Sequence, residues 1–259
     1  MTGGGGGLGR ASATALSGAG AAVSVVDIDE SACQRTAEAI RGAGGRALAL
    51  AANVAQEPEI KNVVARTVSE WGRLDILHNN AAEMDPEVLA RDGKVLDLDP
   101  ELFARVFAVN VIGYALGAKH AIPHMLVHGG GVVINTASVT GHSAELGRIM
   151  YGTTKSAIHG LTRNIATQHG KQGIRCVSIS PGVIITPGIR DHLSQTEIDL
   201  FTEHNALNRS GTAEDVGSLI AYLAGDGAGF ITGSDIVIDG GLLAHFPTVA
   251  DEERLRNQA

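Results

Sequence analysis

The sequence predicts one α/β domain built on a doubly wound parallel sheet, with helices on both faces in three α/β/α layers. Short apolar, β-branched runs alternate with longer amphipathic segments along the chain. This alternation is typical of repeated strand–helix–strand units. Glycine is abundant, with 34 residues among 259, which suits many tight turns between such units. No linker interrupts this rhythm, so residues 1–259 are expected to form a single domain.

The expected strands are short apolar runs, and they cover residues 22–27, 46–51, 74–78, 131–136, 174–180 and 236–238. The expected helices cover residues 30–43, 57–71, 100–127, 151–168 and 213–224. Glycines follow the first two helices and favour their ends there, and Pro123 is expected to interrupt the third.

Two stretches break this rhythm. Residues 83–99 are polar and are expected to form a loop. Residues 187–210 form an insertion with helical patches. Ligands of such sheets bind at the carboxyl ends of the strands, so this insertion is predicted to be a lid over the substrate.

Charge and composition exclude several classes of partner. The net charge of −8 and an aromatic content of 3% argue against nucleic acid and anionic membranes. The sequence shows no apolar run of membrane-spanning length and no leader, and Cys33 and Cys176 are expected to be reduced thiols. A cytoplasmic location is therefore expected.

The first residues, Thr2-Gly3-Gly4-Gly5-Gly6-Gly7-Leu8-Gly9, suggest a phosphate-binding turn that leads into a helix. A flexible glycine tail is the alternative. Asp27 ends the following strand 18 residues after Gly9, near the spacing at which an acidic residue meets the adenosine ribose. A carboxylate there selects NAD over NADP, unless Asp27 is only a turn residue.

Tyr151 and Lys155 are four residues apart and would share one helical face. A nearby ammonium favours the phenolate of a tyrosine, which otherwise has a pKa near 10. Tyr151 is thus a candidate general acid–base, and Ser138, 13 residues earlier, is a candidate to hold the same substrate oxygen.

These motifs, taken together, resemble the short-chain dehydrogenase/reductase family, in its single-domain NAD-preferring branch with a Rossmann-like fold. The resemblance covers nearly the whole chain. Its motifs occur in the family's order: the glycine turn, Asn79-Asn80-Ala81, Asn110, Ser138, Tyr151 with Lys155, Pro181-Gly182 with Thr186, Ile231-Thr232-Gly233 and Asp239-Gly240-Gly241.

The resemblance implies a catalytic tetrad of Asn110, Ser138, Tyr151 and Lys155, in which Asn110 holds a relay water. It also implies a cofactor site made of Gly3, Gly7, Leu8, Gly9, Asp27, Ile28, Asn53, Val54, Asn80, Ala81, Tyr151, Lys155, Pro181, Gly182, Ile184 and Thr186. The cofactor would be NAD. Family members are usually homotetramers or dimers that pair through the helices containing Asn110 and Tyr151, so a homotetramer is expected, with a dimer as the fallback.

The sequence departs from the family pattern at three places. Asn53 stands where aspartate is usual beside the adenine, and Ala82 replaces a glycine. The family also has a full strand before the glycine turn, where only Met1 stands here. The first strand is therefore expected to be missing. A start site chosen too late is favoured over a truly short protein, because every later motif is intact.

Other polar groups admit two interpretations. His120, His124 and His128 share a helix face, but an interface or solvated face is favoured over a metal site, and no metal is expected. His142, Glu145 and Arg148 form either a polar surface loop or part of the substrate pocket.

The favoured function is hydride transfer between NAD and a secondary alcohol or ketone, with the substrate a small molecule. One alternative is reduction of a 3-oxoacyl thioester, which would favour NADP and a basic docking patch. A non-catalytic dinucleotide-binding protein is the other, and the Ser138, Tyr151 and Lys155 set argues against it.

Overall fold

The computed structural model describes residues 1–190 and 194–257, so residues 191–193 of the expected lid and residues 258–259 lie outside the described residues. All strand pairs are parallel. The strands are β1 (Ala22–Asp27), β2 (Arg46–Ala51), β3 (Ile76–Asn79), β4 (Gly131–Thr136), β5 (Ile174–Pro181), β6 (Ile184–Ile185), β7 (Gly211–Thr212) and β8 (Asp235–Ile238).

The helices that cover the sheet follow the strands in alternation, as the sequence predicts. They are α1 (Gly7–Gly18), α2 (Glu30–Gly42), α3 (Glu57–Trp71), α5 (Pro100–Phe107), α6 (Gly113–Val127), α7 (Ile149–His169) and α10 (Ala213–Ala224). Shorter or peripheral helices are α4 (Pro86–Arg91), α8 (Pro187–Arg190), α9 (Gln195–Glu203) and α11 (Val249–Asn257).

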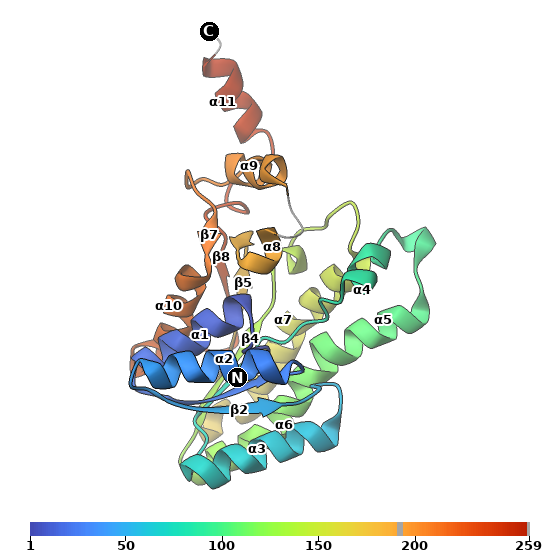
Figure 1. The fold of residues 1–259 in the computed structure, drawn as a ribbon. Coiled ribbons are helices and arrows are strands. Elements are labelled where there is room, and N and C mark those ends of the chain that lie inside the picture. Colours follow the sequence, from blue (N-terminus) through green and yellow to red (C-terminus); the bar gives the residue numbers. More distant parts are fainter. Residues whose placement is uncertain (191–193, 258–259) are drawn as a thin grey trace.

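Helices lie on both faces of the parallel strands (Figure 1). One apolar core joins α1, α2 and α10 to β1, β4 and β5. A second core joins α6 and α7 to the other face of β3, β4 and β5. The three-layer, doubly wound architecture predicted from the sequence is therefore confirmed.

The strands form a four-stranded part in the order β3-β4-β5-β8 and a separate pair β1-β2. Residues Met1–Gly4 connect the two parts. Val26 N donates to Met1 O at 3.0 Å, and Thr2 N donates to the His78 carbonyl of β3 at 2.9 Å. The position between β1 and β3, where the family resemblance calls for a full strand, is thus held by a single parallel bridge from Thr2 to Val26.

The expected break at Pro123 is wrong, because Pro123 lies inside α6. A π-helical segment (η2, Ala108–Ile112) joins α5 to α6, so Pro100–Val127 is helical throughout. By length and composition this stretch would suffice to cross a membrane, contrary to the sequence-based expectation. In the fold it packs against α3 and β3, yet only 33% of its most apolar window is buried.

The prediction of a loop over residues 83–99 is also wrong. Asp85 accepts a hydrogen bond from Glu87 N and caps α4, whose first residue is Pro86, and a short 3₁₀ turn covers Val95–Asp97. The insertion at 187–210 does carry helical segments, α8 and α9, and these lie beyond the carboxyl ends of the strands with β6 and β7 (Figure 1).

The turns that lead into β4 and β5 touch through their backbones. Gly130 has φ +132°, and a Cβ there would lie 2.2 Å from Gly173 O. Gly130→Ala therefore combines backbone strain with a backbone clash, and we expect a loss of about 1–3 kcal/mol of unfolding free energy. Urea or thermal unfolding measures it. Gly42→Ala, where a Cβ meets nothing within 4 Å, is the control; equal stability of the two variants would contradict this account of the turns.

Candidate active site

Asn110 is fully buried in the π-helical segment η2. Its Oδ1 accepts a hydrogen bond from Glu83 N at 2.8 Å, and its Nδ2 donates to Thr154 Oγ1 at 3.0 Å. Thr154 lies on α7 between Tyr151 and Lys155. π-Helical bulges are frequent at functional sites because they turn a side chain away from the regular helical face. Here the bulge ties α5 and α6 to α7.

Lys155 is 1% exposed, and its ammonium donates to the Thr136 carbonyl at the end of β4, at 2.7 Å. The same Nζ lies 5.6 Å from the centroid of the Tyr114 ring and 5.4 Å from that of the Tyr151 ring. Burial, helped by the charge of Arg148, lowers the pKa of Lys155 to about 7. The sequence predicted that Lys155 and Tyr151 lie on one face, and the structure brings them together.

A second cation lies beside Tyr151, in addition to the Lys155 that the sequence spacing predicted. The Arg148 guanidinium lies over the Tyr151 ring, 4.2 Å from its centroid. Burial raises the pKa of Tyr151, while Arg148 and a hydrogen bond with Ser138 act to lower it. Ser138, two residues after the end of β4, is thus beside the phenol as predicted, and the cation that opposes the burial effect is Arg148.

The start of α7 is fixed by a buried carboxylate that the sequence analysis missed. Asp92, 6% exposed, accepts hydrogen bonds from Met150 N at 2.8 Å and Tyr151 N at 2.9 Å. Arg148 precedes the helix with φ 59°, a left-handed conformation that is costly for a residue with a Cβ. Its N–H donates to the Asp92 carbonyl at 2.8 Å. No sequence motif marks Asp92, since it lies in a polar stretch 59 residues before Tyr151.

The glycine turn lies against the segment that follows β3. Asn80 Nδ2 donates to Gly3 O at 3.1 Å, and the N–H groups of Asn80 and Ala81 face Thr2 Oγ1 at 3.1 and 3.3 Å. A Cβ on Gly9 would lie 1.8 Å from Gly3 O, so only glycine fits there. The turn is therefore an ordered backbone loop, and the alternative of a flexible tail is wrong.

The N-terminus of α1 fits an anion. Gly6 stands at its N-cap, and among the described residues no side chain caps it and no acidic residue lies in its first turn. Its first N–H groups, which include those of Gly7, Leu8 and Gly9, lack i−4 carbonyl partners within the helix and carry the positive end of the helix dipole. A pyrophosphate suits such an end.

Asp27 ends β1 beside this turn. Its Oδ2 accepts a hydrogen bond from Gly5 N at 3.0 Å, and its Oδ1 one from Asp29 N at 3.3 Å. Each oxygen keeps a further lone pair that a ribose hydroxyl could use. Ile28, next in sequence, is 73% exposed, as a residue covered by a bound adenine would be.

The remaining predicted cofactor residues line the same edge of the sheet. Thr186 Cγ2 lies 3.4 Å from where a Gly7 Cβ would stand. Pro181 ends β5 and Gly182 follows it, with Gly182 N donating to Ile238 O, and Ile184 is buried in β6. Two further residues lie after β2: Asn53 Oδ1 accepts from Ala55 N, and Val54 is buried.

A cavity of about 500 Å³ opens beside the start of α7. Its lining includes His142, Glu145, Arg148 and Lys94, and its volume suits a small organic molecule. Ser138, Tyr151 and Lys155 are not among its lining residues, so both interpretations of the first three residues, a polar surface loop and a part of the substrate pocket, stay open. Of the three histidines His120, His124 and His128, His120 contacts Glu57 of α3, with 2.9 Å between Nε2 and Oε1.

Comparisons with known proteins agree with this geometry. A family model described as enoyl-(acyl carrier protein) reductase matches residues 4–243. The 7α-hydroxysteroid dehydrogenase of Bacteroides fragilis is 36% identical over 189 residues, 73% of this chain and 72% of that protein. The 2-(R)-hydroxypropyl-CoM dehydrogenase of Xanthobacter autotrophicus is also 36% identical, over 77% of this chain and 79% of its own.

A solved 7α-hydroxysteroid dehydrogenase, complexed with NADH and 7-oxo glycochenodeoxycholic acid, superposes with a TM-score of 0.87. It is 27% identical in sequence, and the match covers 93% of this chain and 92% of that one. The predicted oxidoreductase activity, hydride transfer between NAD and a secondary alcohol or ketone, is confirmed at this level. The chain belongs to the short-chain dehydrogenase/reductase family.

Proposed function

We propose that this NAD-dependent enzyme oxidises a small secondary alcohol to a ketone and, in the reverse direction, reduces the ketone to the alcohol. Tyr151 is the general acid–base in both directions. The observation that carries the proposal is the convergence of Tyr151, Ser138 and two cations at the carboxyl end of β4. A phenol in that setting can exchange a proton with a substrate oxygen.

Cofactor binding is assigned to the turn and strand ends described above. The N-terminus of α1 would hold the pyrophosphate, and Asp27 would accept hydrogen bonds from the adenosine ribose. When bound, NAD accepts the hydride that leaves the carbinol carbon. Asp27 also disfavours the additional phosphate of NADP by charge repulsion.

Side chains of this protein hold the substrate oxygen and transfer the proton. Ser138 Oγ would hold the substrate oxygen, and Tyr151 Oη would take the proton from the hydroxyl group. Lys155, held by the Thr136 carbonyl, places a positive charge beside the ring below its pKa of about 7, and Arg148 keeps one there at higher pH; a nearby positive charge favours the phenolate. Asn110 is proposed to position the relay that returns the proton to solvent, since its amide contacts α7 next to Lys155 through Thr154.

The relatives support the proposed substrate class. Their names specify a 7α-hydroxysteroid and 2-(R)-hydroxypropyl-CoM, and both names denote hydroxylated molecules. Reduction of a 3-oxoacyl thioester is the second candidate. The matching family model is described as an enoyl-(acyl carrier protein) reductase, which shares an acyl thioester substrate with this candidate but reduces a carbon–carbon double bond, and Asp27 argues against the NADP that this candidate would favour.

We also propose a homotetramer, with a dimer as the fallback, in the cytoplasm. The apolar stretch Pro100–Val127 supports assembly, because Ile112 and Val127 on it are 46% and 79% exposed. A second copy packed on this stretch would remove that surface from water.

Tyr151→Phe removes the proton-carrying oxygen and leaves the ring and Lys155 in place. We expect kcat to fall roughly 10²–10⁴-fold, the range for general acid–base catalysis, while the affinity for NADH stays within about two-fold. Steady-state kinetics with a panel of secondary alcohols and fluorescence titration of NADH measure both. Tyr222→Phe, on exposed α10, is the control. Near-native turnover of Tyr151→Phe would refute the proposed role.

Asp27→Ala should weaken NAD by about 1.5–3 kcal/mol, the value of a hydrogen bond to a charged group, and should relieve the repulsion of NADP. Asp27→Asn separates two causes, because its amide oxygen can still accept from Gly5 N while the charge is lost. The measurement is the ratio of kcat/KM for NAD to that for NADP, with Glu38→Ala, exposed on α2, as the control. An unchanged ratio in both Asp27 variants would locate the selector elsewhere.

Arg148 lowers the pKa of Tyr151, so its removal should raise that pKa. Oxidation requires the phenolate, which forms as the pH rises through this pKa. The pH profile of kcat/KM for alcohol oxidation in Arg148→Met should therefore move to higher pH. Arg66→Met, exposed on α3, should keep the wild-type profile. A profile unchanged or moved to lower pH in Arg148→Met would contradict the influence of Arg148.

A further inference from the structure

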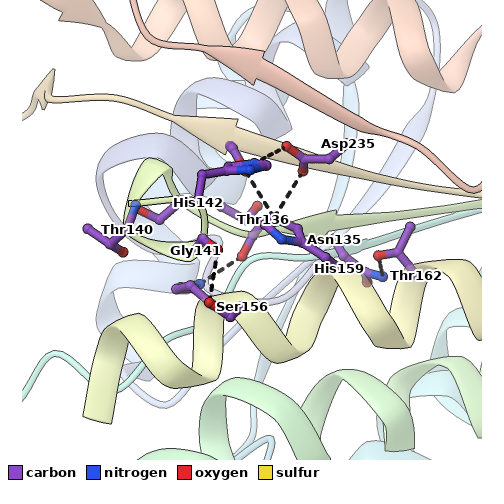
Figure 2. Close-up of polar contacts among 12 residues, drawn as sticks. Asn135, Thr136, Thr140, Gly141, His142, Ser156, His159, Thr162 and Asp235 are labelled. Atoms are coloured by element: carbon purple, nitrogen blue, oxygen red, sulfur yellow. Dashed lines mark hydrogen bonds and ion pairs between the residues drawn. The ribbon is translucent and has the colours of Figure 1, made fainter. Parts of the chain in front are cut away.

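Three side chains that are distant in the sequence converge beside the active site. They are His142 after the Val139–Gly141 turn, His159 on α7 and Asp235, the first residue of β8. Figure 2 shows the two imidazoles and the carboxylate pointing toward one another. His142 Nε2 lies 2.8 Å from Asp235 Oδ2, and His159 Nε2 lies 3.5 Å from Oδ1.

A fourth polar atom completes the cluster. Ser180 Oγ, on β5, lies 3.3 Å from Nε2 of each of the two histidines. Ligands of tetrahedral zinc at 2.0–2.2 Å lie about 3.3 Å from one another. The nitrogen and oxygen atoms of the cluster are thus already spaced like ligands around one ion, and the three ligand atoms of the histidines and the aspartate all lie within 4.8 Å of each other.

Burying the Asp235 carboxylate with no positive charge nearby costs free energy. The side chains of His159 and Asp235 are 11% and 13% exposed, and Asp235 Oδ1 is buried without a hydrogen-bond partner among the described residues. A buried carboxylate requires a cation or several donors.

We propose that His142, His159 and Asp235 bind a divalent transition-metal ion of the zinc type, with Ser180 or water filling the coordination sphere. Two imidazoles and one carboxylate are typical ligands of Zn²⁺, whereas Mg²⁺ and Ca²⁺ require mainly oxygen ligands.

The ion would join three elements that surround the catalytic residues. His142 follows Ser138 by four residues, and His159 follows Lys155 by four on the same helix. A metal between them and β8 would fix the segment after β4 against α7 and so restrict the loop that carries Ser138. The site itself does not depend on the proposed reaction, so it is tested without NAD or substrate.

The experiment uses the tag-free chain after treatment with a chelator. Isothermal titration with Zn²⁺ should give one bound ion per chain. Co²⁺ should produce visible d–d absorption typical of nitrogen and oxygen coordination at low coordination number. His159→Gln and Asp235→Asn should each weaken Zn²⁺ at least ten-fold and abolish the Co²⁺ bands.

His142→Gln provides a third variant at the most exposed of the three side chains, where a folding defect is least expected. His128→Gln, an exposed histidine at the end of α6, is the matched control and should bind like the wild type. Near-UV circular dichroism establishes that each variant is folded. Absence of stoichiometric binding by the wild type would overturn the proposal and leave a metal-free His–Asp–His hydrogen-bonded cluster. Equal affinity in folded His142→Gln and His128→Gln would overturn it too.

Discussion

The parallel direction of the strands is the constraint on which the rest of the molecule depends. Because β3, β4 and β5 run the same way in a fixed register, their last residues meet at one edge of the sheet. The segments after them carry Asn80, Ser138 and Thr186, which lie far apart in the sequence. The chemistry of the protein is concentrated at this edge because every polar group placed after a strand arrives there.

Helix α7 supplies the other half of the site. Hydrogen bonds hold it to the rest of the chain at its first residues and again one turn later. At its start, Asp92 accepts the N–H groups of Met150 and Tyr151. One turn later, Lys155 donates to the last carbonyl of β4. These contacts fix the rotation of the helix relative to the sheet, so the Tyr151 ring is oriented before any ligand binds.

Much of this arrangement could be predicted from the sequence, and the reason is burial. The strands at 22–27 and 131–136 match the structure because a sheet covered on both faces demands continuous buried runs. The family motifs located Tyr151, Lys155 and Ser138. By contrast, α4 was missed because a six-residue polar helix has little apolar periodicity. Pro123 was misjudged because the packing of α6 outweighs the loss of one backbone hydrogen bond.

The site features that could not be predicted require tertiary proximity. Asp92 resembles any other loop aspartate until the chain folds and places it under α7. The roles assigned to Asn110 and Asp27 remain predictions. His142 seemed to belong with Glu145 and Arg148, and nothing in the sequence associates it with His159 or with Asp235, 93 residues later.

The left-handed backbone of Arg148 has a consequence for how the protein can change over time. A residue with a Cβ held at positive φ costs roughly 1–2 kcal/mol, so folding stability is sacrificed at the point where a guanidinium covers the Tyr151 ring. Glycine there would relieve the backbone and strengthen the fold, but it would remove the cation. Stability and acid–base chemistry are therefore in opposition at this one position, and selection for robustness alone would erode activity.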